Sequence, residues 1–221
     1  MSASSKSSST SSAADAAAAS GVPPERFSLR FRVGRLLLSI LFKSYFRVTV
    51  SGAEAVPASG PVILASNHQT FLDPPMVGLR VDRPPIYLAR RSLFRNPLFS
   101  AFIRFFGAVP IDREGPGVGS LRQSLRFLEA GRVLVLFPEG TRSRDGAVGP
   151  FRPGVALLAE KAAAAVVPVR IRGGEKVFPK GKRFPRPGRM SVRFGEPLRL
   201  RAGEDARAFL RRIEEAVRRL D

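Results

Sequence analysis

The chain has 221 residues, enough for one domain with its own hydrophobic core. It has no cysteine and one histidine, which excludes disulfides, zinc–thiolate sites, a cysteine nucleophile and a histidine-rich metal cluster. The 37 basic residues, of which 31 are arginine, outnumber the 18 acidic residues by 19, so we expect a polyanionic partner such as nucleic acid, anionic lipid or a phosphorylated substrate.

Residues 1–20 are mostly Ser and Ala and cannot bury enough apolar area to offset the entropy of the chain, so we predict a disordered tail over residues 1–22. A Ser-rich, acid-poor start is also weakly typical of a transit peptide, but no Arg precedes Arg26. The segment 23–46 is apolar with interspersed basic residues, and its longest uncharged run, Leu36 to Phe42, is far shorter than the roughly 20 residues of a spanning helix. We predict a helical segment that either lies in the plane of a membrane or packs on the domain, and we favour the membrane.

From residue 47 onward, short apolar runs alternate with helical patterns. The runs predict strands at 61–65, 85–89, 108–111, 133–137, 166–171 and 190–194, and the patterns predict helices at 93–106, 120–130, 154–165 and 205–220. Residues 173–189, rich in Gly, Pro and basic side chains, are predicted to form a loop. This alternation predicts one α/β domain over residues 47–221, with a mostly parallel mixed sheet flanked by helices.

Phenylalanine dominates the aromatic residues, with 17 Phe, 2 Tyr and no Trp. A protein that reads single-stranded nucleic acid presents aromatic side chains from strands. Here many Phe residues fall in predicted helices beside Arg, which favours a membrane surface as the partner, and nucleic acid is not expected. The residues that we expect to face the membrane are Phe94, Phe99, Phe102, Phe105 and Phe106.

His68 follows the predicted strand 61–65, and Asp73 lies five residues further on. On one helix these positions would differ by about 500° and face differently. On a turn that enters a helix, the carboxylate can fold back onto the imidazole, accept from one ring nitrogen and leave the other for a substrate hydroxyl. Judged alone, the two residues are more typical of a plain turn, so their catalytic role depends on the segments that accompany them.

Two further segments follow strands at the edge where α/β proteins place their sites. Phe137 to Arg144 begins at the end of the most hydrophobic strand and offers a glycine, hydroxyls and guanidinium groups suited to phosphate. Ile111-Asp112-Arg113 ends another strand with an arginine. A solvated charged loop is the alternative explanation for each segment.

Together and in this order, these segments resemble the PlsC-type glycerolipid acyltransferases, which acylate lysophosphatidate. Asn67-His68 with Asp73 resembles the first sequence block of that family, and Phe137 to Ser143 resembles the third almost letter for letter. The second and fourth blocks resemble Leu88 to Leu93 with Gly107 to Arg113, and Val167-Pro168-Val169 with Ile171 and Gly173. The resemblance covers about residues 48–200. The family often has Lys at the position of Arg90 and an acidic residue at Ser92, a departure that bears on acceptor preference.

The resemblance implies an O-acyltransferase of the 1-acylglycerol-3-phosphate type, acting in phospholipid biosynthesis. His68 would act as general base, oriented by Asp73, on the free sn-2 hydroxyl of 1-acyl-glycerol 3-phosphate, giving phosphatidate. The acyl donor would be acyl-CoA or an acyl carrier protein, with no metal or other cofactor. The enzyme would be peripheral or monotopic on the cytoplasmic face of a membrane. The substrate-binding residues implied are Arg113, Glu139, Gly140, Thr141 and Arg142, and the supporting residues are Asn67, Arg90 and Pro168.

Alternatives remain open at this stage. The acceptor could be another lysophospholipid, a lyso-aminolipid or glycerol 3-phosphate, although enzymes acting on the last are usually longer. A non-enzymatic basic protein that binds membranes or nucleic acid with a degenerate site is less favoured, because His68, Asp73, Glu139 and Arg142 are all intact.

Overall fold

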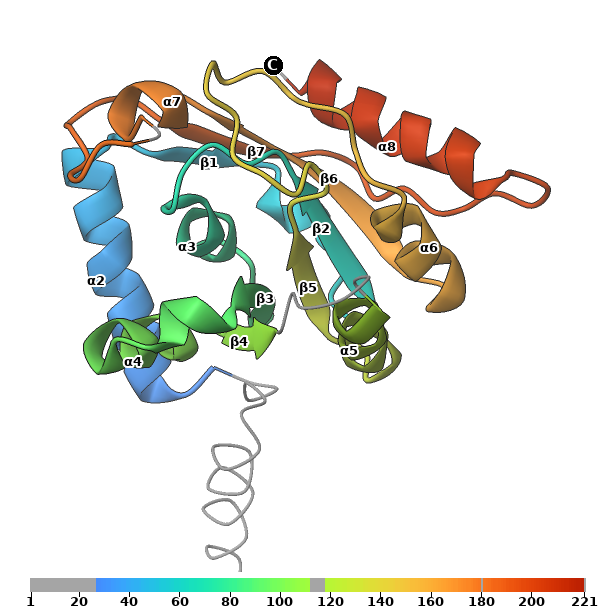
Figure 1. The fold of residues 1–221 in the computed structure, drawn as a ribbon, viewed down its shortest axis with the longest axis horizontal. Helices are drawn as coiled ribbons and strands as arrows, with labels where there is room; N and C mark the ends of the chain where they lie inside the picture. Colours follow the sequence, from blue (N-terminus) through green and yellow to red (C-terminus); the bar gives the residue numbers. More distant parts are fainter. Residues whose placement is uncertain (1–26, 112–117, 180, 221) are drawn as a thin grey trace, which may run out of the picture.

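The structure, a computed structural model, describes residues 27–111, 118–179 and 181–220. Within these ranges a seven-stranded sheet with the order β1-β7-β6-β2-β5-β3-β4 is flanked by helices (Figure 1). Every neighbouring pair is parallel except β6 with β7. The predicted mixed, mostly parallel sheet is therefore confirmed, whereas the tail predicted over residues 1–22 lies outside the described residues.

The elements follow one another in strand–helix alternation. The strands are β1 (Thr49–Ser51), β2 (Val62–Ser66), β3 (Pro85–Arg90), β4 (Ala108–Ile111), β5 (Val133–Leu136), β6 (Ala165–Arg172) and β7 (Ser191–Phe194). The helices are α2 (Leu29–Tyr45), α3 (Asp73–Gly78), α4 (Pro97–Phe105), α5 (Val118–Glu129), α6 (Gly154–Lys161), α7 (Gly174–Val177) and α8 (Ala206–Arg219), with short 3₁₀ turns η1 (Ala53–Ala55) and η2 (Arg91–Phe94).

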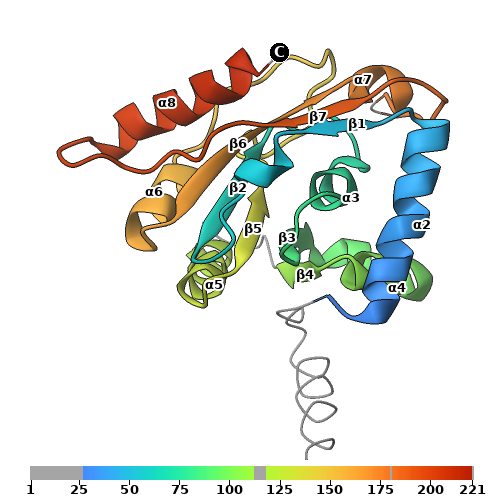
Figure 2. The ribbon, with the colours of Figure 1, turned by 180° about the vertical axis from the view of Figure 1, so that it is seen from behind.

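Helices cover both faces of the sheet, which is why the central strands are continuous apolar runs. On one face, α5, α6 and α8 pack on side chains such as Ile63 and Leu134. On the other face, α2 and α3 pack on the alternate residues, such as Leu64 and Val135. Figure 2, seen from behind, shows the same separation, with α2, α3 and α4 on one side of the sheet and α5, α6 and α8 on the other.

Three predicted boundaries were wrong, each for a local reason. The helix expected over 93–106 is split into η2 and α4, because Asn96 caps a new helix by accepting from Phe99 N at 2.9 Å and Pro97 occupies the first turn. The helix expected over 154–165 ends at Lys161, since Ala163 adopts a left-handed conformation (φ 48°) and β6 begins at Ala165. The loop expected over 173–189 contains the short helix α7.

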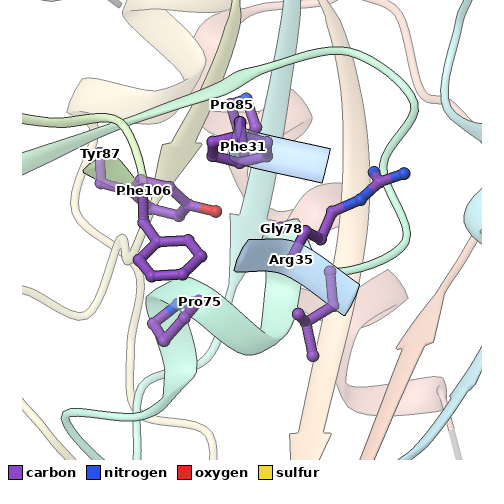
Figure 3. A pocket seen from close by; sticks show the side chains of 8 residues that line it. Phe31, Arg35, Pro75, Gly78, Pro85, Tyr87 and Phe106 are labelled. Carbon is purple, nitrogen blue, oxygen red and sulfur yellow. The ribbon is translucent and has the colours of Figure 1, made fainter. Parts of the chain in front are cut away.

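Helix α2 packs on the domain by one face and exposes apolar side chains on the other. Two side chains of α2 face the domain. Phe31 stacks on Phe105 with ring centroids 5.5 Å apart, and Arg35 Nη1 donates to Val81 O at 2.9 Å. Figure 3 shows Phe31 and Arg35 beside Tyr87, around a cavity of about 10 Å³, room for one water at most. The side chains exposed on α2 are Leu29, Val33, Leu36, Leu37, Ile40 and Leu41. A helix packed on the domain and a helix in the plane of a membrane are thus compatible interpretations of this segment, because packing on the domain uses only part of the helix surface.

Among the helices within the described ranges, none is both long and apolar enough to cross a bilayer. The parallel strands β2, β3, β4, β5 and β6 end at one edge of the sheet, because neighbouring parallel strands run the same way. The loops that leave this edge carry the sequence segments singled out above.

Candidate active site

His68 and Asp73 meet directly at the end of β2. The distance from His68 Nδ1 to Asp73 Oδ2 is 2.8 Å, and Asp73 is the first residue of α3. The expected geometry, a carboxylate that folds back from a helix start onto the ring, is therefore confirmed. The His68 side chain is 20% exposed and that of Asp73 is fully buried. Since Nδ1 is occupied by the carboxylate, Nε2 is the ring nitrogen that remains for a substrate.

Donors from one short turn surround the Asp73 carboxylate. Oδ2 accepts from Gln69 N at 2.5 Å and from Thr70 N at 2.9 Å, in addition to His68. Oδ1 accepts from Thr70 Oγ1 at 2.7 Å. Four donors match the acceptor capacity of an ionised carboxylate, which has no proton of its own to give. The imidazole therefore carries its proton on Nδ1 and presents a lone pair at Nε2.

The loop after β5 holds the other side of the histidine. Phe137 stacks on the imidazole with ring centroids 4.1 Å apart. Glu139 Oε1 accepts from His68 N at 3.1 Å, and Ser143 N donates to His68 O at 2.7 Å. Both main-chain polar groups of His68 are therefore bonded to one loop that lies more than 70 residues away in sequence. The ring is fixed by stacking and the backbone by hydrogen bonds, which leaves the base little conformational freedom.

Glu139 is a buried carboxylate beside the candidate base. Burial raises its pKa above the usual range, and hydrogen bonds from the backbone of His68 and Gly149 oppose that shift. Arg170 contributes a weaker favourable charge. The hydrogen bond from His68 N stabilises this buried carboxylate and ties the loop after β5 to the histidine turn.

Two amide side chains connect the histidine turn to β6 and α7. Asn67 Nδ2 donates to Ile171 O at 2.9 Å, and Asn67 Oδ1 accepts from Ile171 N at 2.7 Å, so this side chain continues the β2–β6 ladder beyond the end of β2. Gln69 Oε1 accepts from Gly174 N at 2.8 Å, and Gln69 Nε2 donates to Gly146 O at 3.2 Å. Both side chains are buried, and each donates one hydrogen bond and accepts another, so they hold the histidine turn against β6, α7 and Gly146.

The predicted substrate-binding residues after β5 form a tight turn beside His68. Gly140 has a φ of 70°, and a Cβ there would lie 2.7 Å from the Arg152 guanidinium, so a larger residue would strain the backbone and displace the Arg152 side chain. Thr141 is exposed next to it. The guanidinium carbon of Arg142 lies 3.7 Å from the centroid of the Phe71 ring. Burial lowers the pKa of Arg142, whereas Asp73 favours its charged form.

Two other predicted residues, Arg90 and Pro168, lie on strands of the sheet and not on the histidine turn. Arg90 ends β3, two strands from β2 at the same edge, and is exposed. Pro168 lies inside β6, paired with Ala65, where the β6–β7 ladder has not yet begun. A proline fits there because the ladder needs no donor from it. Arg113 lies outside the described residues, so its position relative to the site is not defined.

Sequence reasoning missed several contacts of this site. Thr70, Gln69 and Phe137 were read only as neighbours of the key residues, and Phe71 was not connected to Arg142. For Thr70 a local signal existed, since a hydroxyl residue three positions before an Asp at a helix start commonly exchanges hydrogen bonds with it. The contacts of Gln69 and Phe137 depend on chain segments far away in sequence and had no local signal.

Comparisons with known proteins agree with this geometry. The family model described as Acyltransferase matches residues 47–172. The chain is 31% identical over 155 residues to a 1-acyl-sn-glycerol-3-phosphate acyltransferase of Bacillus subtilis, covering 68% of this chain and 73% of that protein. It is 32% identical over 161 residues to a chloroplast 1-acyl-sn-glycerol-3-phosphate acyltransferase of Arabidopsis thaliana, covering 72% of this chain and 45% of that protein.

A solved structure is similar over most of the fold. The crystal structure of the 1-acyl-sn-glycerophosphate acyltransferase PlsC from Thermotoga maritima superposes with a TM-score of 0.72 and 28% sequence identity, covering 86% of this chain and 77% of that chain. The chain spans just under half the length of the plant chloroplast relatives that it matches. The histidine turn and the loop after β5 both fall within the matched family range.

Proposed function

The chain belongs to the acyltransferase family, and on this basis we propose that it transfers an acyl group from a thioester donor to the free sn-2 hydroxyl of 1-acyl-glycerol 3-phosphate. The observation that carries the proposal is the His68–Asp73 contact of 2.8 Å at the end of β2. It rests also on the names of the relatives, which are 1-acyl-sn-glycerol-3-phosphate acyltransferases. The products are phosphatidate and the free thiol of the donor.

In this mechanism His68 Nε2 accepts the proton of the acceptor hydroxyl, and Asp73 stabilises the imidazolium that forms. The hydroxyl oxygen attacks the thioester carbonyl and forms the new ester C–O bond. The C–S bond then breaks, and the leaving thiolate takes the proton from the imidazolium. The acyl group passes directly from sulfur to oxygen, so the enzyme needs no nucleophile of its own.

The cation best placed for the acceptor phosphate is Arg142. Its guanidinium is held over the Phe71 ring beside the His68–Asp73 pair. A stacked, partly desolvated guanidinium loses little entropy when it binds a phosphate through two hydrogen bonds. Thr141, Gly140 and Arg113 belong to the same proposal as further acceptor contacts.

Replacement of Arg142 by Gln is expected to raise the KM for lysophosphatidate about tenfold or more, since a hydrogen bond to a charged group contributes about 1.5–3 kcal/mol. The KM for the acyl donor should change much less. Arg144→Gln is the matched control, because Arg144 lies two residues away on the same loop and is exposed. Equal increases in KM for both substrates would contradict a specific role in acceptor binding.

We further propose that the protein binds the membrane surface through the exposed apolar face of α2 and the adjoining side chains of α4. Leu36 and Leu37 on α2 are about 60% exposed, and Leu98 on α4 is 83% exposed. Phe99, Phe102 and Phe105 add aromatic surface on α4. Arg30, Arg32 and Lys43 are exposed on α2 and would attract anionic headgroups. This placement brings the active site to the bilayer in which an amphiphilic acceptor resides.

The double change Leu36→Glu with Ile40→Glu is expected to lower cosedimentation with anionic liposomes by about 10²-fold or more, since each buried aliphatic side chain contributes about 1.5–3 kcal/mol. Activity on a water-soluble short-chain acceptor should persist. Ala130→Glu with Ala202→Glu serves as a control with the same change of charge, because both alanines are exposed and lie next to α5 and shortly before α8, helices that pack on the other face of the sheet. Unchanged liposome binding by the α2 variant would refute this docking face.

The proposed reaction is tested by a panel of lysolipid acceptors assayed with acyl-CoA and with acyl carrier protein. The panel should contain 1-acyl-glycerol 3-phosphate, other lysophospholipids, a lyso-aminolipid and glycerol 3-phosphate. The highest kcat/KM is expected for 1-acyl-glycerol 3-phosphate. A clear preference for an acceptor without a terminal phosphate would contradict the proposed acceptor, and absence of transfer to every acceptor would contradict the reaction itself.

A further inference from the structure

A large cleft lies beside the histidine turn, and Gln69 of that turn is among its lining residues. Its volume is about 850 Å³, within the range of ligand sites. The end of β6, α7, the loop before β7 and Arg47 between α2 and β1 line it, together with Gly146 from the loop after β5. Five basic side chains line this cationic cleft against two acidic ones: Arg47, Arg170, Arg172, Lys176 and Arg189 against Asp145 and Glu175.

Arg170 at the base of the cationic cleft has buried donors without a partner. Its Nε and Nη1 atoms are buried and have no hydrogen-bond partner among the described residues. Burial lowers the pKa of Arg170, the neighbouring Arg172 acts in the same direction, and Glu139 and Glu175 favour its charged form. Leaving such donors unsatisfied is costly, so a bound anion that accepts from them would be stabilised.

Two acidic side chains also line the cationic cleft, and they offset only part of its positive charge. Asp145 is bonded within its own loop, accepting from Ser143 Oγ at 2.8 Å and from Ala147 N at 3.0 Å. Glu175 lies against Gly146, where a Cβ would come within 3.0 Å of its Oε2. The lining therefore carries a net excess of three positive charges, which favours an anionic ligand.

The cationic cleft connects directly to the catalytic turn through Gln69. This residue follows His68, its N–H is bonded to Asp73, and its side chain bonds Gly174 of α7 and Gly146 in the cleft wall. In the sheet, β2 lies between β6 and β5. An anion in the cationic cleft would therefore lie next to the histidine turn, and Arg142 is not among the residues that line the cleft.

We propose that the cationic cleft binds the phosphate groups of the phosphopantetheine-bearing acyl donor, at a site separate from the Arg142 guanidinium proposed for the acceptor phosphate. This inference rests on the proposed acyl transfer. The acyl donor and the lysolipid acceptor are both anionic, and their phosphates would repel each other in one cationic cluster. Two separate cationic subsites avoid this repulsion. Free CoA and the prosthetic group of a carrier protein share the phosphopantetheine phosphate, and the experiment below separates them.

Arg47 offers a substitution that removes charge without disturbing the backbone. It is exposed and has a φ of 46°, a left-handed conformation that Asn adopts more readily than most residues. Arg47→Asn combined with Arg189→Gln therefore removes two charges from the rim of the cationic cleft. Arg183→Gln with Arg186→Gln is the matched control, because both residues are exposed on the loop before β7 and neither lines the cleft.

Calorimetric titration of the full chain with CoA, dephospho-CoA and pantetheine measures donor binding without any reaction. The cleft variant is expected to lose CoA affinity by about tenfold for each contact removed, while the control variant binds as the unmodified protein does. Pantetheine, which has no phosphate, should bind both alike. Arg170→Gln should lower CoA affinity further than the cleft variant does. If Arg170→Gln does not fold, the cleft variant, Arg47→Asn with Arg189→Gln, still provides the test.

Steady-state assays distinguish the outcomes. A higher KM for acyl-CoA with an unchanged KM for the lysolipid supports the inference with CoA as donor, and a higher KM confined to acyl carrier protein supports it with the carrier. A rise in KM confined to the lysolipid, or an unchanged KM for both donors, overturns the inference. CoA binding that depends on the cleft, in a protein that acylates no lysolipid, would contradict the proposed function and leave the cleft assignment intact.

Discussion

His68→Ala is expected to lower kcat for acyl transfer by about 10²- to 10⁴-fold, the usual contribution of a positioned general base. The reason is geometric: Nδ1 is 2.8 Å from Asp73 Oδ2, and Nε2 is the ring nitrogen left to take the hydroxyl proton. The chain has no second histidine to replace it. The measurement is the initial rate with saturating donor and acceptor, on purified protein.

His68→Gln provides the matched comparison for this loss. Its side-chain amide can still donate toward Asp73, so the buried carboxylate keeps a partner, but it cannot accept a proton near neutral pH. Both variants should keep the wild-type melting temperature within a few degrees and bind liposomes normally. Near-wild-type turnover by either folded variant would rule out base catalysis by His68.

Asp73→Asn should lower kcat by on the order of 10³- to 10⁴-fold, by analogy with the corresponding Asp→Asn change in a serine protease triad. The carboxylate accepts hydrogen bonds from His68, Gln69 and Thr70. Asparagine would replace one accepting oxygen by an NH₂ group, whose two N–H bonds would face these donors. The imidazole would then shift its proton to Nε2 and lose the lone pair that serves as the base. The KM values should change far less than kcat.

The same substitution should lower the free energy of unfolding, because each buried donor left without an acceptor costs about 1–3 kcal/mol. Thermal and urea unfolding measure this loss. Asp82→Asn is the control, since Asp82 is exposed and the charge change is identical. A variant with wild-type stability and wild-type kcat would show that the buried carboxylate neither orients the base nor holds the turn.

Local patterns in the sequence predicted much of the fold. The apolar runs Val62–Ser66 and Val133–Leu136 are buried strands, because only a sheet covered on both faces accommodates such runs. The errors were also local. The cap at Asn96 and the left-handed Ala163 ended helices whose hydrophobic periodicity continued, since periodicity reports burial and not the backbone conformation of single residues.

The His68–Asp73 contact was accessible from sequence because one turn of five residues makes it. The donors to Asp73 come from the same turn, so no distant segment is needed to form the pair. Glu139 was selected for its place in a loop that the resemblance implies to bind substrate. The structure shows that it also accepts from His68 N, a contact across 71 positions in sequence.

The sequence by itself therefore determined the alternation of strands and helices, the family resemblance and the turn that joins His68 to Asp73, because each depends on neighbouring residues. The tertiary structure decided which distant segments meet: Phe137 with His68, Asn67 with Ile171, and the basic residues that form the cationic cleft beside Gln69. It also decided which face of α2 packs on the domain and which stays exposed. The physical reason is that strand order and helix packing are set by the summed burial of the whole chain, and no local pattern records that sum.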